Sequence, residues 1–117
     1  MKKVKFCREL VENSNFEDKK ALLELSEHIL KSMDSIGIKY IDENFEKVAE
    51  NHIVELSIRI LNDAQIQDAE TPFDRSQVTE EAWGKAAKIN EDLKQKFGTK
   101  LTNFETFLIA THFMLNA

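Results

Sequence analysis

The sequence predicts an all-α fold, a compact antiparallel bundle of four to five helices. The 117-residue chain contains only three glycines and one proline, too few for the many tight turns of a β-fold. Apolar residues recur at intervals of three and four positions in four segments, which is the pattern of amphipathic helices. Apolar and charged fractions of 42% and 32% are typical of a soluble globular domain. We therefore expect one domain over residues 1–117, in which residues 1–15 form an extension or a short helix over 4–12.

The first long helix is expected over residues 16–34. Ser14 and Glu17 have the spacing of a capping box, in which the serine accepts a first-turn N–H and the glutamate reaches back to the serine. One apolar stripe follows, made of Leu22, Leu25, Ile29 and Met33. Gly37 suits the end of this helix.

The second helix is expected to begin near Asp42, a good N-cap residue. Its predicted stripe contains Phe45, Val48, Ala49, His52, Ile53, Leu56 and Ile60. Glu43 and Glu46 are interpreted as first-turn acids favoured by the helix dipole. A loop over residues 63–75 follows and contains Pro72; it is long enough to be mobile or functional.

The third long helix is expected over residues 76–97, and Gly98 suits its left-handed C-terminal position. Its inward residues are predicted to be Trp83, Ala86, Ile89 or Asn90, Leu93 and Phe97. Thr102 and Glu105 form a second capping-box pattern. The last helix then carries an inward stripe of Phe104, Phe107, Leu108, Thr111, His112 and Leu115.

Several classes of function are disfavoured by composition. The net charge of −5 argues against a general nucleic-acid binder, which needs a basic face. No segment approaches the roughly 20 apolar residues of a membrane span, and no apolar run follows the basic start as in a secretory signal. Cys7 is the single cysteine, which excludes an internal disulfide and favours a reducing cytoplasm. We expect no cofactor, because no phosphate loop is present, and no metal, because Cys7 and all three histidines would have to meet in one place.

Two histidines fall on the predicted apolar stripes of different helices, His52 on the second and His112 on the last. A histidine in such a position is most often a partly buried residue with one hydrogen-bond partner, and His28 is interpreted as an ordinary boundary residue. Arg59 follows His52 by seven residues and lies on the same helix face. It can extend to solvent or offer its donors to a phosphate or carboxylate. Nothing pairs a nucleophile with a base at recognisable spacing, so an enzyme is not expected.

The two histidine segments resemble a known family. Residues 51–59, NHIVELSIR, resemble the D-H-[IL]-x-x-A-x-x-R element of PTS regulation domains (PRDs). Residues 97–113, FGTKLTNFETFLIATHF, resemble the family's F-G-[IV]-x-L-P-x-D-E-x-x-[FY]-[IL]-[AT]-[LM]-H element. The order of these elements and the separation of their histidines, about sixty residues, also match. Asn51, Phe104 and Thr111 depart from the family pattern, and Asn51 replaces an acid.

This resemblance implies a histidine-phosphorylated module of the kind found in bacterial antiterminators and activators of sugar operons. It implies that His52 and His112 are phosphoacceptors, supplied by HPr or by an enzyme II B component of the phosphotransferase system. Arg59, Asn51 and Glu105 would support the histidines or the phosphate. A homodimer is expected, and the added charge would change its arrangement. The chain resembles a free-standing PRD with no room for an RNA-binding or DNA-binding domain.

Two other interpretations stay open. In the first, the chain is a degenerate PRD that is not phosphorylated and serves as a dimerising scaffold or an accessory subunit; Asn51 favours it. In the second, it is a histidine-phosphotransfer carrier of a phosphorelay, which is also a helical bundle. Such a carrier needs one exposed histidine, so the presence of two histidine elements argues against it.

Overall fold

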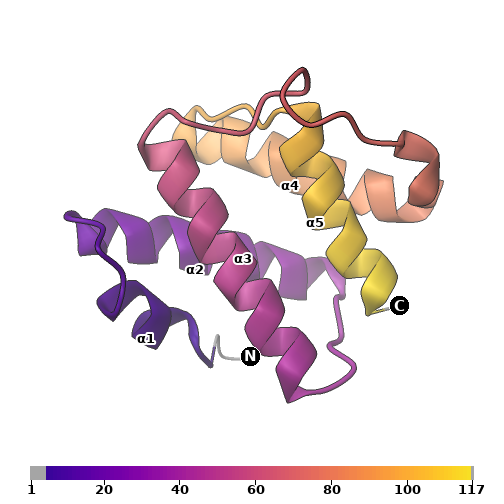
Figure 1. Ribbon diagram of the computed structural model, residues 1–117. Helices are drawn as coiled ribbons and strands as arrows, with labels where there is room; N and C mark the ends of the chain where they lie inside the picture. The colour runs from indigo at the N-terminus through magenta and orange to yellow at the C-terminus, as the bar shows by residue number, and fades with distance from the viewer. Residues whose placement is uncertain (1–4, 117) are drawn as a thin grey trace. The chain divides into compact units, whose positions relative to one another are not determined.

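The predicted all-α fold class is confirmed. The computed structural model describes residues 5–116, and these contain helices and connecting loops but no strand. Figure 1 shows α1 (Cys7–Glu12), α2 (Lys19–Ile36), α3 (Glu43–Leu61), α4 (Glu80–Phe97) and α5 (Asn103–Leu115), and a short 3-10 helix, η1 (Arg75–Gln77), precedes α4. The predicted start of the first helix at Val4 lies outside the described residues. The chain divides into two compact units, one ending at Asp63 and one beginning at Ala64, and the prediction of a single domain stays a prediction.

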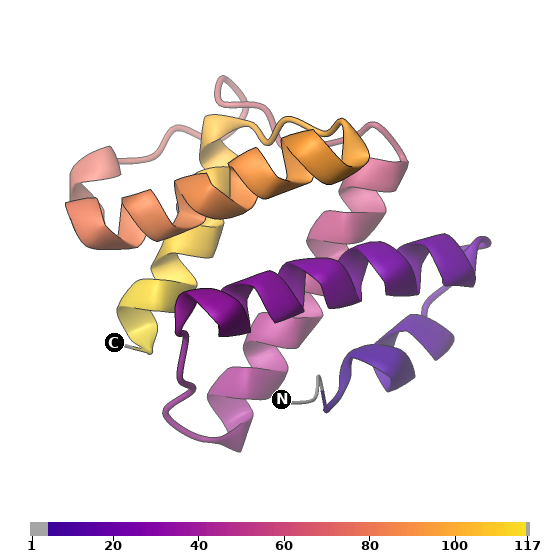
Figure 2. The same cartoon turned by 180° about the vertical axis from the view of Figure 1, so that it is seen from behind.

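The first unit contains α1, α2 and α3. Figures 1 and 2, seen from opposite sides, both show α2 crossing α3, and α1 contacts both of these helices. The predicted stripe of α2 is confirmed, because its four members are all 0–2% exposed: Leu22, Leu25, Ile29 and Met33. Cys7 and Val11 bury the inner side of α1 against this core.

Of the three helix ends predicted for the first unit, two are confirmed. Asp42 caps α3 by accepting the N–H of Phe45 at 3.0 Å. Gly37 ends α2 at φ 108°, a left-handed conformation that glycine adopts without strain. The capping box at Ser14 was the wrong prediction, because Asp18 caps α2 by accepting the N–H of Ala21 at 3.1 Å. The Ser14 hydroxyl instead donates to the carbonyl of Val11 at 2.6 Å, at the end of α1.

The buried face of α3 differs from its predicted stripe. Val48 is 49% exposed, and His52 is also exposed. The buried face is shifted to a set that includes polar residues: Glu46, Ala49, Glu50, Ile53, Val54, Leu56 and Ser57. Because α3 contacts two helices, its buried arc is wide, and the apolar pattern alone could not show that glutamates occupy part of it.

The second unit contains η1, α4 and α5. Both views show α5 crossing α4 obliquely. The start of α4 is later than predicted, because Thr79 caps it by accepting the N–H of Ala82 at 3.0 Å, while residues 75–77 form η1. Gly98 ends α4 at φ 67° as expected. Phe97, predicted to face inward, is 37% exposed because α4 ends there.

Helix α5 is buried almost all round. The predicted inward residues Phe104, Phe107 and His112 are buried, whereas Leu115 in the last turn is 55% exposed. Ile109 and Phe113 are buried although they lie off the predicted stripe. An apolar sequence of this kind has no single face, so its stripe could not be defined from spacing alone.

The loop before η1 is bound to the start of α5. Six hydrogen bonds connect residues 65–68 with residues 100–105. Asp68 Oδ1 accepts the N–H of Phe104 at 2.8 Å, and Ile66 N donates to Glu105 Oε2 at 3.0 Å. Phe73 packs on Phe104 and Phe107, with ring centroids 5.8 and 4.8 Å apart. The long loop is therefore a fixed part of the second unit.

Candidate functional site

The first candidate site is the exposed side of α3 around His52. Asn51 and Glu55 are exposed beside it, and Arg59 is half-buried in the last turn of the helix. Seven residues on a helix advance about 10.5 Å and return to nearly the same face, so His52 and Arg59 share one side of α3. The long guanidinium side chain can cover much of that distance. The structure therefore presents an accessible imidazole with an arginine two turns away.

His112 has a different environment. It lies in the last turn of α5 and is only 5% exposed. Its carbonyl accepts both the backbone N–H and the side-chain amide of Asn116, at 3.2 and 2.9 Å. A protein donor can reach this imidazole only after the surrounding side chains move.

Glu105 has a contact that the sequence did not predict. It is completely buried in the first turn of α5, and its carboxylate accepts the N–H of Ile66. Only half of the predicted capping box forms, because Thr102 Oγ1 accepts the N–H of Glu105 at 3.2 Å while Thr102 N donates to Gln65 at 3.0 Å. Seven residues separate Glu105 from His112, and its supporting role toward that histidine stays a prediction.

The structure also contains a buried acidic pair that the sequence analysis missed. Glu50 is 1% exposed and Glu46 is 5% exposed, and they lie one helical turn apart on α3. Glu50 Oε1 accepts the N–H of Phe6 at 2.9 Å, and the two residues are 44 positions apart in the sequence. A sequence signal was present, since these two acids continue the row of Ile53 and Ser57 along the helix.

Burial at this pair changes the acidity of the groups around it. Desolvation is the main cause that raises the pKa of Glu50, with the neighbouring Glu46 adding to it, while the bonds from the backbone act in the opposite direction. Burial, followed by the charge of Glu50, raises the pKa of the Cys7 thiol to about 12. The pKa of Tyr40 is raised by burial and then by Glu50, Glu46 and Asp34. The cluster therefore holds its protons tightly.

Residues 5–116 contain no group of three or more histidine, cysteine, aspartate or glutamate side chains placed to hold a metal ion. None of the helices within that range has the length and apolar character needed to cross a membrane. Comparison with models of protein families, with curated proteins and with solved structures found no match.

Proposed function

We propose that the chain is a cytoplasmic regulatory phosphoacceptor of the PRD kind, phosphorylated on histidine by HPr or an enzyme II B component and acting through protein–protein contacts. The proposal rests on the resemblance of residues 51–59 and 97–113 to the two histidine elements of that family. The observation that carries it is the exposure of His52, because a protein donor must bring its phosphoryl group to the imidazole nitrogen.

In the proposed transfer, a ring nitrogen of neutral His52 attacks the phosphorus of the donor's phosphohistidine. The new N–P bond forms as the donor's N–P bond breaks, and the donor imidazole takes up the proton that His52 releases. The product carries up to two negative charges on the outside of α3. We propose Arg59 as the partner of this charge, because it shares the face of His52 and offers a fork of donors. Asn51 offers a neutral amide beside it.

The burial of His112 gives the two histidines different roles in this proposal. His52 accepts the phosphoryl group first, and His112 accepts it slowly, because its side chain must become accessible before a donor can react. The 5% exposure of His112 supports this order.

The first measurement is the intact mass of the protein after incubation with phosphoenolpyruvate, enzyme I and HPr, with and without enzyme II B components, at neutral or alkaline pH. We expect one phosphoryl group to be gained rapidly, and a second one slowly. His52→Ala should abolish the rapid phase, and His112→Ala should abolish only the slow one. His28→Ala is the matched control, since this half-buried histidine of α2 lies outside both elements. If no donor adds mass to the natural protein, phosphorylation is excluded.

A second candidate function is a dimerising scaffold that is not phosphorylated. The burial of His112 favours it, because a buried histidine is poorly placed to meet a phosphoryl donor. Sedimentation equilibrium tests this candidate, which requires a dimer at micromolar concentration. A monomer at every concentration would contradict it.

A further inference from the structure

One carboxyl group of α3 caps α1 and helps to attach it to the rest of the first unit. The N-cap residue of α1, Phe6, has no side-chain cap of its own, and Glu50 of α3 instead accepts its N–H at 2.9 Å. A helix of six residues is not stable in isolation, so α1 depends on this capping and on the burial of Cys7 and Val11.

The carboxyl group that caps α1 lies one helical turn from a second buried carboxyl group, that of Glu46. Two ionised carboxylates have only acceptor atoms, so a hydrogen bond between them requires a proton on one of the two. Both side chains are at most 5% exposed, and a second buried charge in this place would be costly. The pair is therefore suited to hold one proton and one negative charge.

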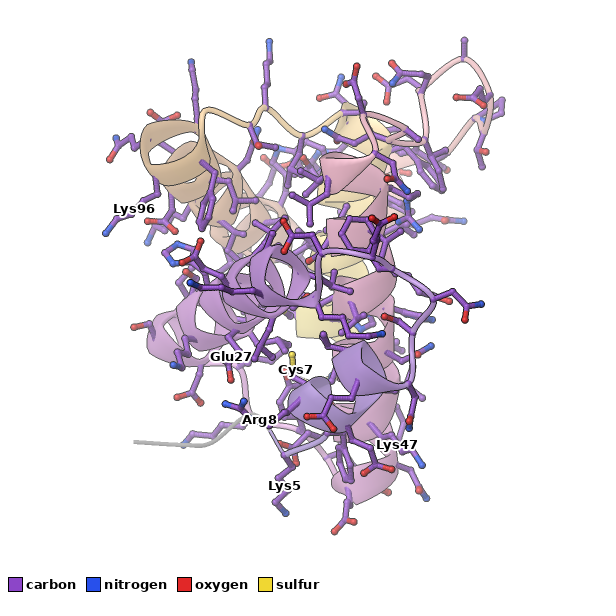
Figure 3. All side chains as sticks on the ribbon, turned by 90° about the vertical axis from the view of Figure 1, so that its left-hand side faces the viewer. Lys5, Cys7, Arg8, Glu27, Lys47 and Lys96 are labelled. Atoms are coloured by element: carbon purple, nitrogen blue, oxygen red, sulfur yellow. The ribbon has the colours of Figure 1, made fainter. Side chains whose placement is uncertain are left out.

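The other contacts around α1 are exposed and weak. Figure 3 shows Lys5 and Arg8 on its outer side and the sulfur of Cys7 pointing into the unit. Lys5 lies 3.9 Å from Glu43, and Arg8 lies 3.9 Å from Glu27. Lys47 lies 5.8 Å from the centre of the Phe6 ring. Tyr40 is a further ionisable group of the first unit, and the charges of Glu50, Glu46 and Asp34 act on it.

We propose that α1 is a pH-sensitive latch, docked on α2 and α3 while the Glu46–Glu50 pair holds one proton and released when the pair loses it. This inference is independent of the proposed phosphoryl transfer. Loss of the proton leaves two negative charges one turn apart in a buried place. Release of α1 exposes both charges to water, which lowers their energy.

The direction of the pH effect follows from the raised pKa of Glu50. A carboxyl group with a higher pKa in the docked state binds its proton more tightly there than in the released state. The contribution to docking is therefore complete below the ordinary glutamate pKa of 4.5 and is lost as the pH rises through the raised value. Mildly acidic solution should keep α1 docked, and alkaline solution should release it.

The only cysteine provides a direct measurement of this release, because Cys7 is 0% exposed on α1. The labelling rate of Cys7 is measured with 4,4′-dithiodipyridine from pH 5 to pH 8.5. At each pH, the labelling rate of the same protein in guanidinium is divided by this rate. This ratio, the protection of Cys7, removes the pH dependence of the thiol chemistry itself. We expect protection to fall as the pH rises through this range, because the docked state loses the proton that favours docking.

The matched variant is Glu50→Gln, whose amide oxygen still accepts the N–H of Phe6 and whose amide nitrogen can donate to Glu46. Its protection should be constant with pH, and Glu12→Gln, at an exposed acid of α1, should keep the natural pH dependence. Far-UV circular dichroism should lose no more than the signal of the six residues of α1. A constant protection in the natural protein would overturn the latch, as would a loss of helix larger than α1 that runs parallel to the loss of protection. Persistence of the pH dependence in Glu50→Gln would assign it to another group, such as His28, and would also overturn the proposal.

Discussion

Ser26 and Ser57 are both completely buried in the first unit, but their hydroxyl groups differ. Ser57 Oγ donates to the carbonyl of Ile53 at 2.8 Å. Ser26 Oγ makes no hydrogen bond within residues 5–116. A buried polar group without a partner loses its bonds to water and gains nothing in return. At the scale of single residues, the first unit is therefore less than optimally stable at Ser26.

Replacing Ser26 with alanine should stabilise the first unit. We expect the free energy of unfolding to rise by about 1 kcal/mol, because an unsatisfied buried hydroxyl is removed and alanine is the better helix former. Urea denaturation followed by circular dichroism measures the change. Ser57→Ala is the control at equal burial, and it should leave stability unchanged or lower it, since it removes a made hydrogen bond. A loss of stability in Ser26→Ala would show that its hydroxyl has a partner.

At the scale of helices, the sequence predicted where helices begin and end better than it predicted which of their faces are buried. Asp42, Gly37 and Gly98 act as predicted, because a cap needs only a few neighbouring residues. The predicted start of α2 was wrong, because Asp18 caps this helix in place of Ser14. The predicted buried face of α3, and with it the predicted inward position of His52, was wrong, because the buried face depends on which helices pack against α3.

Two glycines, Gly84 inside α4 and Gly98 at its C-terminal cap, should respond to alanine in opposite ways. Gly98 has φ 67°, which is unfavourable for alanine, so Gly98→Ala should lower the free energy of unfolding by about 1 kcal/mol. Gly84 lies inside the helix with nothing within 4 Å of an added Cβ, and Gly84→Ala should raise stability by about 1 kcal/mol. Thermal unfolding of the two variants measures both effects. Equal effects of the same sign would show that conformation at Gly98 does not limit substitution.

At the scale of the whole molecule, the chain places its two candidate histidines in different units. His52 belongs to the first unit, which also carries the Glu46–Glu50 pair, and His112 belongs to the second. The sequence predicted the all-α class and the residues of interest from composition and spacing. It did not predict the buried carboxyl pair, because burial of a glutamate depends on donors such as Phe6 N that lie 44 residues away.

The binding of the loop to α5 also has a consequence for the order of folding. Asp68 and Phe104 are 36 residues apart, so their hydrogen bond forms only after a long segment of chain has closed. The cap of α4, in which Thr79 bonds to Ala82, needs no such closure. We therefore expect α4 to form early and the start of α5 to be fixed late, after the transition state.

Stopped-flow kinetics of Asp68→Ala, monitored by the fluorescence of Trp83 in the same unit, tests this order. The variant should unfold about five- to tenfold faster, as loss of roughly 1–1.4 kcal/mol predicts, and should refold at nearly the natural rate. Thr79→Ala should instead slow refolding, because its bond belongs to the early helix. A slower refolding of Asp68→Ala would mean that the loop docks before the barrier. On the expected result, the residues that bind α5 govern how long the second unit persists once folded, and have little influence on how fast it is made.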